Sequence, residues 1–228
     1  MPSAPPVPPM PSVPYQSEDT TRAPRRGRRL VVGSALALAL GGGLLACSTV
    51  AGAAPGPVAP DVSVRNVTAA PSRHEAPPMT ASEPTRLVVP AAGVDTSPVL
   101  RLGLDAEGGL QVPSVDEAEQ AGWYTGGVTP GEKGPAVLVA HYDTAKGPAL
   151  LRDVAKVRTG DLIRVGRADG STAVFEVREI QQVDKKDFPT NKVYGKTDRP
   201  ELRLITCGGP IADGHRTDNI ILFAGLVK

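Results

Sequence analysis

The chain has 228 residues, a formal net charge of +1 and 21% charged residues, a size that accommodates one compact domain with tails. This near-neutral balance excludes a surface built to bind polyanions, so nucleic acid is not an expected partner, and it excludes the highly charged type of disordered chain. Fifteen of the 24 prolines precede residue 85, whereas seven of the eight aromatic residues follow residue 84, so composition places the folded domain at about residues 85–228.

Residues 1–29 form a tail rich in proline and serine that ends in a cluster of four arginines. Because this tail has almost no large aliphatic side chains, it cannot bury enough apolar surface to offset the entropy of ordering, and we expect it to be disordered. Residues 30–54 follow without a single charge, and this run exceeds the roughly 20 residues needed to cross a bilayer. The arginines before the run predict a cytoplasmic N-terminus and an extracellular remainder.

The sequence leaves the fate of this apolar segment open. It can remain as a signal anchor that holds the protein in the cell membrane by a single pass, it can be a lipoprotein signal with Cys47 as the lipidated residue, or it can be cleaved to give full secretion. Residues 55–84 are rich in proline and alanine and are expected to form an extended extracellular linker. All three outcomes place residues 85–228 outside the cell.

From residue 85 onward, short apolar runs alternate with turn residues, a pattern that predicts an all-β sandwich or barrel. The runs lie at residues 86–89, 99–104, 136–141, 162–165, 172–183, 201–207 and 219–227. The pair Asp169-Gly170 stands between two of these runs and predicts a tight hairpin. Residues 115–120 and 187–194 are the two stretches that suggest short helical turns.

Cys207 is the single cysteine of the expected extracellular domain, because Cys47 falls in the apolar segment. Such a residue is either a small buried apolar side chain or a nucleophile. An apolar run ends at Cys207, and Gly208-Gly209-Pro210 terminates it. We therefore expect the thiol at a strand end, where a substrate carbonyl can approach it.

A nucleophilic thiol needs a partner for proton transfer, because the thiolate is the species that attacks. Of the three histidines, His74 falls in the linker and His215 in a polar loop, whereas His141 ends an apolar run. His141 is thus either a structural residue or the partner of the thiol. Arg216 precedes the last run and is either an ordinary surface cation or a group that stabilises an oxyanion.

Several short motifs of the domain form a recognisable set. They are Gly122-Trp123-Tyr124 with Pro130-Gly131 and Gly134, His141-Tyr142-Asp143 with Gly147-Pro148-Ala149, Leu204-Ile205-Thr206-Cys207-Gly208-Gly209, and Arg216-Thr217-Asp218-Asn219. In these motifs the chain resembles the sortases, most closely the class F sortases of actinobacteria. The resemblance implies an eight-stranded sortase-type β-barrel with short helical turns, with the histidine, the cysteine and the arginine at one end.

The resemblance also implies an activity. A sortase of this type is a cysteine transpeptidase that cleaves the LPxTG-like sorting signal of surface proteins between Thr and Gly and transfers the acyl group to an amine of a peptidoglycan precursor. Carried over to this chain, Cys207 is the nucleophile, His141 the acid and base, Arg216 the oxyanion or substrate-positioning group, and Thr206 a residue that helps to orient the substrate. We expect no metal and no cofactor.

Two other functions stay open at this point. One is a sortase-like peptidase that mainly hydrolyses the acyl enzyme, and the other is a catalytically silent module that binds the cell wall and has an inert Cys207. The sequence leaves open which surface proteins are substrates, which amine is the acceptor, and whether an LAxTG signal is preferred to LPxTG.

Overall fold

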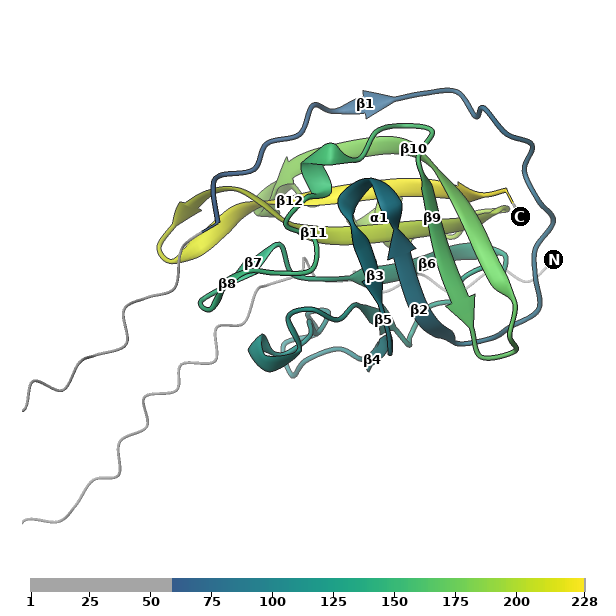
Figure 1. The fold of residues 1–228 in the computed structure, drawn as a ribbon, viewed down its shortest axis with the longest axis horizontal. Helices are drawn as coiled ribbons and strands as arrows, with labels where there is room; N and C mark the ends of the chain where they lie inside the picture. Colours follow the sequence, from purple (N-terminus) through teal and green to yellow (C-terminus); the bar gives the residue numbers. More distant parts are fainter. Residues whose placement is uncertain (1–58, 228) are drawn as a thin grey trace, which may run out of the picture. The chain divides into compact units, whose positions relative to one another are not determined.

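The computed structural model describes residues 59–227, and in this range the chain is built almost entirely from β-strands (Figure 1). The strands are β1 (Val67–Thr68), β2 (Pro84–Val89), β3 (Val94–Thr96), β4 (Leu100–Leu102), β5 (Gly122–Tyr124), β6 (Gly134–Val139), β7 (Asp143–Thr144), β8 (Gly147–Pro148), β9 (Leu162–Arg167), β10 (Thr172–Asp184), β11 (Pro200–Ala212) and β12 (His215–Leu226). The tail expected at residues 1–29 and the membrane segment expected at residues 30–54 lie outside the described residues.

Helical structure in the described residues is limited to short turns. One is the α-helix α1 (Thr190–Tyr194), and the others are 3-10 turns at Pro90–Ala92, Val115–Glu117, Val154–Lys156 and Lys185–Asp187. Two of these turns and α1 coincide with the two stretches predicted to be helical. Within residues 59–227, no helix has the length and apolar character needed to cross a membrane.

Ten strands belong to one curled sheet with the order β3-β2-β9-β10-β12-β11-β6-β5-β4, and β1 pairs with β10 beside this path (Figure 1). Most neighbours are antiparallel, but β6 pairs with β11 in parallel and β4 pairs with β5 in parallel. β7 and β8 form a separate two-stranded sheet. The mostly-β architecture is confirmed, whereas the main sheet has more than the eight strands expected, because three-residue strands such as β3 and β5 are too short to stand out as apolar runs.

The hairpin predicted at Asp169-Gly170 joins β9 to β10. Thr172 stands opposite Gly166 in the antiparallel register, and the turn is closed by a hydrogen bond from the Gly170 amide to the Arg167 carbonyl, 3.0 Å. Gly170 has a φ of 82°, a left-handed conformation that glycine adopts without steric cost. The prediction from the Asp-Gly pair is therefore confirmed.

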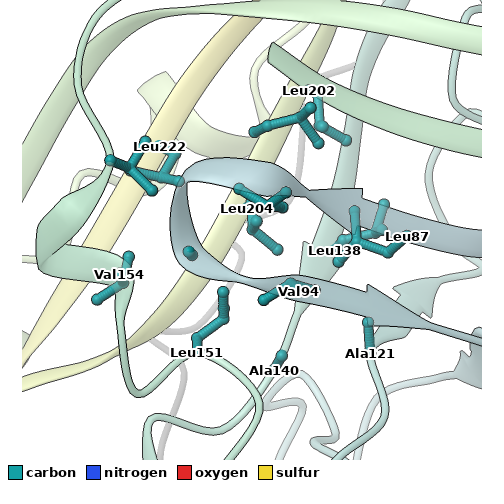
Figure 2. Close-up of a cluster of buried hydrophobic side chains, with 14 of the residues drawn as sticks. Leu87, Val94, Ala121, Leu138, Ala140, Leu151, Val154, Leu202, Leu204 and Leu222 are labelled. Carbon is teal, nitrogen blue, oxygen red and sulfur yellow. The ribbon is translucent and has the colours of Figure 1, made fainter. Parts of the chain in front are cut away.

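The main hydrophobic core is enclosed by the curled sheet (Figure 2). It includes Leu138 from β6, Leu204 from β11 and Leu222 from β12, each less than 2% exposed. The alternate residues of the same strands, among them Val139 and Ile205, belong to a second cluster with Val193 and Tyr194 of α1. Successive side chains of a strand point to opposite faces, so these central strands are buried on both sides and are held rigidly.

The described part of the predicted linker, residues 59–83, lies against the domain instead of extending away from it. In Figure 1 this blue segment starts near the β11–β12 hairpin and runs beside β10 toward β2. The Ala76 amide donates to the Leu226 carbonyl at 3.1 Å and the Met79 amide donates to the Gly131 carbonyl at 2.8 Å. Composition predicted an extended chain, and the backbone is extended, but its polar groups find partners on the domain.

Glu176 of β10 provides a buried polar anchor for this segment. Its carboxylate is 1% exposed and accepts hydrogen bonds from the Ser72 hydroxyl, from the Ser72 amide at 3.2 Å and from the Arg73 amide at 3.3 Å. The Arg73 guanidinium adds an ion pair at 2.9 Å. Burial raises the pKa of Glu176, but the hydrogen bonds and the charge of Arg73 outweigh burial and leave the pKa below its usual value.

We predict that the stability contributed by Glu176 depends on acid. A carboxylate whose pKa is lower in the folded state stabilises the fold above its unfolded pKa, and this contribution is lost as the pH falls through the folded pKa. Glu176→Gln removes the charge, so its melting temperature at pH 7 should be lower than that of the wild type. The difference between the two melting temperatures should become smaller as the pH falls from 5 to 3. A gap that stays constant across this range, measured by thermal unfolding, would contradict the prediction.

Candidate functional site

His141 and Cys207 lie at the same end of the sheet because of one parallel strand pair. In β6 and β11, Val139 stands opposite Ile205, and the Ala140 amide donates to the Ile205 carbonyl at 3.1 Å. Cys207 lies two residues later in β11, and His141 lies two residues beyond the end of β6. Because parallel strands run in the same direction, residues that follow a paired position by the same number of residues lie near one another.

Arg216 reaches the same end through the β11–β12 hairpin and ties the two segments together. Its Nη1 donates to the carbonyl oxygen of Gly209 at 2.7 Å, two residues after Cys207. Its Nη2 donates to Oδ2 of Asp143 at 2.7 Å, two residues after His141. The register of the hairpin shifts between Gly208 and Ile211. The structure thus brings together the three residues predicted to form the site.

The groups around Cys207 shift the pKa of its thiol in opposite directions. The residue is half-buried and is not part of a disulfide. Burial has the largest effect and raises the pKa of the thiol, and the charge of Asp143 raises it as well. Lys185, which donates a hydrogen bond to the sulfur, lowers the thiol pKa, and so does the charge of Arg216. The net result is a thiol pKa above the usual value, so the thiol is mostly protonated at neutral pH.

His141 is held by a backbone hydrogen bond. It is 4% exposed, and its Nε2 lies 2.6 Å from the carbonyl oxygen of Pro113. Because a carbonyl oxygen can only accept, Nε2 carries the hydrogen and donates it.

Arg216 is a buried cation and not a surface residue, which removes one of its two sequence interpretations. Its side chain is 4% exposed, and its guanidinium carbon lies 4.9 Å from the centre of the Tyr142 ring. Burial acts to lower the pKa of Arg216, but the hydrogen bond and charge of Asp143 outweigh burial and raise the pKa above the usual value. The guanidinium therefore stays charged. It also contacts residues 59–61.

Three further residues considered in the sequence are Thr206, His74 and His215. Thr206 is 4% exposed, and its Oγ1 is buried without a hydrogen-bond partner among the described residues. His74 is exposed on the segment before β2. His215 begins β12 at the hairpin end, opposite Ala212.

Three residues of the site were not singled out from the sequence. Asp143 was part of a quoted motif, but its ion pair with Arg216 joins positions 73 apart in the chain. Lys185 follows β10 and reaches Cys207 from across β12. Asn219 stands directly opposite Cys207 in the register, and its Nδ2 is buried without a partner in the described range. No local sequence signal marks these neighbours, because each contact depends on the order of strands in the sheet.

The site holds no obvious place for a metal. Within residues 59–227, no group of three or more His, Cys, Asp or Glu side chains is arranged to hold a metal ion. A cavity of about 350 Å³ is lined by Arg178, Arg203 and Phe223, near the first residues of β11, whereas Cys207 lies further along the same strand.

Comparison with known proteins identifies one family. A family model described as a sortase domain matches residues 87–227, which is more than half of the chain. None of the curated proteins matches the chain.

Solved structures with similar folds include three bacterial sortases. Sortase C-1 from Actinomyces oris is 22% identical with a TM-score of 0.48, over 63% of this chain and 73% of that one. Sortase A from Corynebacterium diphtheriae is 20% identical with a TM-score of 0.49, over 65% of this chain and 62% of that one. A sortase D5 transpeptidase from Clostridium perfringens is 19% identical with a TM-score of 0.46, over 64% of this chain and 79% of that one.

The contact between Lys185 and Cys207 gives a direct prediction. Lys185→Met keeps most of the side-chain length but removes the cation and the hydrogen bond, so the thiol pKa should rise further and alkylation by iodoacetamide at neutral pH should slow. Lys186→Met is the matched control, because Lys186 is exposed. The rate of alkylation measured from pH 6 to 11 gives the thiol pKa, and an equal shift in both variants would contradict a specific contact.

Proposed function

The chain belongs to the sortase family and is a cysteine transpeptidase, and from this premise we propose that it cleaves an LPxTG-like sorting signal between Thr and Gly and joins the acyl part to a cell-wall amine. The observation that carries this proposal is the meeting of His141, Cys207 and Arg216 at one end of the sheet. The substrates would be surface proteins that carry such a signal near their C-terminus, and the acceptor an amine of a peptidoglycan precursor.

In the first half of the proposed reaction, the Cys207 sulfur attacks the carbonyl carbon of Thr in the signal. The C–N bond to Gly breaks, and His141 gives a proton to the departing amine. In the second half, the acceptor amine attacks the thioester carbon and loses a proton to His141, and the sulfur leaves. Arg216 stabilises the oxyanion or positions the peptide in both halves, and Thr206 helps to orient the substrate.

The finer class and the location are also part of the proposal. The motifs at His141-Tyr142-Asp143 and Leu204-Ile205-Thr206-Cys207 support a class F sortase of the actinobacterial type. The uncharged residues 30–54 after the arginine cluster support a single-pass anchor in the cell membrane, with the catalytic domain extracellular. Ala54 and Ala59 are five positions apart, and this stretch spans at most about 18 Å, so such an anchor would keep the site close to the membrane, where lipid-linked wall precursors are found.

Product analysis tests the reaction itself. The full chain in detergent is incubated with labelled LPxTG or LAxTG peptide, with and without a diaminopimelate- or glycine-bearing amine, and the products are identified by mass. We expect the ligated peptide, formed faster than the hydrolysed one. Hydrolysis at the same rate with every amine, and no ligated product, would favour the peptidase alternative. Absence of any cleavage would favour the silent binding module.

Substitutions test the assigned roles. Cys207→Ala and Cys207→Ser should abolish turnover without unfolding the domain, because alanine has no nucleophile and a serine hydroxyl is a much weaker acid than a thiol and a poor nucleophile when protonated. Arg216→Lys should lower kcat/KM by about 10²–10³-fold, the usual cost of losing one oxyanion donor, since lysine lacks the planar fork. Circular dichroism controls for folding, and near-native kcat/KM in Arg216→Lys would remove Arg216 from the chemistry.

The raised thiol pKa predicts a characteristic pH profile. The competent enzyme needs Cys207 as the thiolate and His141 as the cation, and burial of the thiol makes this pair a minor form at neutral pH. Turnover should therefore be slow, and kcat/KM should follow a bell-shaped curve that belongs to the pair. A curve that is flat from pH 5 to 10, or full activity in His141→Ala, would contradict this assignment.

A further inference from the structure

The cavity near the first residues of β11 lies apart from the catalytic end of the sheet. Its volume of about 350 Å³ falls within the range of small-molecule sites, about 300–1,000 Å³. Cys207 lies four residues beyond Arg203 of the cavity wall, a separation of roughly 13 Å along an extended strand. None of His141, Cys207 and Arg216 is among the residues that line the cavity. A ligand held there would therefore not occupy the catalytic site.

The wall of this cavity is rich in charged side chains of both signs. Its cations are Arg178, Lys192, Arg199 and Arg203, and its acids are Glu75, Glu179 and Glu201. Two of the cations have an acid of their own. Lys192 pairs with Glu179 at 2.5 Å, and Arg203 pairs with Glu201 at 2.5 Å.

The other two cations, Arg178 and Arg199, share the third acid. Nη1 of Arg178 lies 2.6 Å from Oε1 of Glu75, and Nη1 of Arg199 lies 3.1 Å from the same oxygen. Arg199 also lies 3.8 Å from Glu201, but this acid is already paired with Arg203. Since one carboxylate oxygen serves two guanidiniums, the cavity wall has one positive charge more than its acids neutralise.

Arg178 also has hydrogens that no described residue accepts. Its side chain is 16% exposed, and its Nε and Nη2 are buried without a hydrogen-bond partner within residues 59–227. A buried donor without an acceptor is costly, so such a group in a native fold calls for a partner. Nε and Nη2 form one edge of the planar guanidinium, and such an edge binds both oxygens of a carboxylate through parallel N–H···O bonds.

The backbone of β12 makes room for this guanidinium. Gly225 lines the cavity together with Arg178. A Cβ at position 225 would lie 2.8 Å from Cζ and 2.9 Å from Nε of Arg178. A larger residue at this position would therefore displace the guanidinium, and glycine allows it to lie where it does.

The remaining wall is largely apolar. Phe223, Ala224 and Leu226 of β12 line the cavity with Pro200. An apolar wall with a few polar groups is typical of sites for small ligands. Because the unpartnered donors of Arg178 are buried, a small planar carboxylate fits them better than a bulkier tetrahedral phosphate. The ligand class that matches the wall is a carboxylate on a small apolar body.

We propose that this cavity is a second ligand site of the protein, and that it binds a small apolar carboxylate such as the C-terminal end of a peptide. The carboxylate accepts hydrogen bonds from Nε and Nη2 of Arg178 and supplies the missing negative charge beside Arg199. The apolar body packs against Phe223. This inference goes beyond the proposed reaction and does not depend on it, because it concerns binding at residues that the reaction does not use.

Binding of N-acetyl-leucine to the full chain in detergent, measured by equilibrium dialysis, tests the proposal. N-acetyl-leucinamide has the same apolar body without the charge, so it should bind about tenfold more weakly or less, the effect of losing hydrogen bonds between charged groups. Isocaproate keeps the carboxylate and the branched alkyl group but lacks the peptide group. Tighter binding of N-acetyl-leucine than of isocaproate would support a peptide end as the ligand, and equal binding would support a free acid. Equal affinity for N-acetyl-leucine and its amide would overturn the proposal.

Substitutions locate the ligand in the cavity. Arg178→Met removes both donors and should weaken binding of N-acetyl-leucine by about tenfold or more. Gly225→Ala keeps every charge but displaces the guanidinium, and it should weaken binding by a similar factor. Arg199→Gln, at a side chain that is 62% exposed, should weaken binding by about two- to five-fold, the range for an exposed pair. Arg164→Met is the matched control with unchanged affinity, because Arg164 is exposed on β9 and does not line the cavity.

Two further results would overturn the proposal. One is unchanged affinity in both Arg178→Met and Gly225→Ala, with melting temperatures near that of the wild type. If Arg178→Met does not fold, Gly225→Ala and Arg199→Gln decide, and unchanged affinity in both has the same meaning. The other result is displacement of N-acetyl-leucine by a sorting peptide with a blocked C-terminus, which would place the ligand at the catalytic end.

The same measurements separate this site from the proposed reaction. Cys207→Ala should bind N-acetyl-leucine as tightly as the wild type does, because Cys207 is not part of the cavity wall. Selective binding of the acid over the amide, without turnover of any sorting peptide, would support the second site and overturn the proposed reaction alone. Turnover of a sorting peptide without selective binding would overturn the second site alone.

Discussion

The parallel pairing of β6 with β11 is the interaction on which the site depends. It sets Val139 beside Ile205, and the backbone continues in the same direction from both residues to His141 and Cys207. Both strands are buried on both faces, so a slip of one residue would exchange the residues of the two cores and would be costly. The register that fills the cores is therefore the register that aligns the two reactive side chains.

Arg216 adds a second constraint of a different kind. A buried cation is costly unless hydrogen bonds and an opposite charge compensate it, and here Asp143 and the Gly209 carbonyl do so. Asp143 and Gly209 each follow a reactive residue by two positions, so compensation of the Arg216 charge also ties the segment after His141 to the segment after Cys207. The remaining donors of the same guanidinium bind residues 59–61. One side chain thus connects residues 59–61 to the segments that follow His141 and Cys207.

The proline-rich composition of the N-terminal segment correctly predicted an extended backbone, but it did not predict that this segment lies against the domain. A chain rich in proline has few ways to form its own core, and residues 59–83 form none. Their extended backbone keeps its amides and carbonyls available, and the domain offers partners to them at Glu176, Gly131 and Leu226. Extension therefore made the segment able to wrap around the domain. Of the described linker residues, the first three, 59–61, contact Arg216.

The sequence by itself determined the local features: the strands with strong apolar runs, the Asp169-Gly170 hairpin, and Cys207, His141 and Arg216 as candidates at the ends of runs. These follow from periodicity and turn chemistry, which act over a few residues. The tertiary structure decided the strand order, the burial of Arg216, its pairing with Asp143, the approach of Lys185 to Cys207, and the contacts of residues 59–61 with Arg216. Each of these joins residues that are distant in the chain, and sheet topology, which no local pattern encodes, brings them into contact.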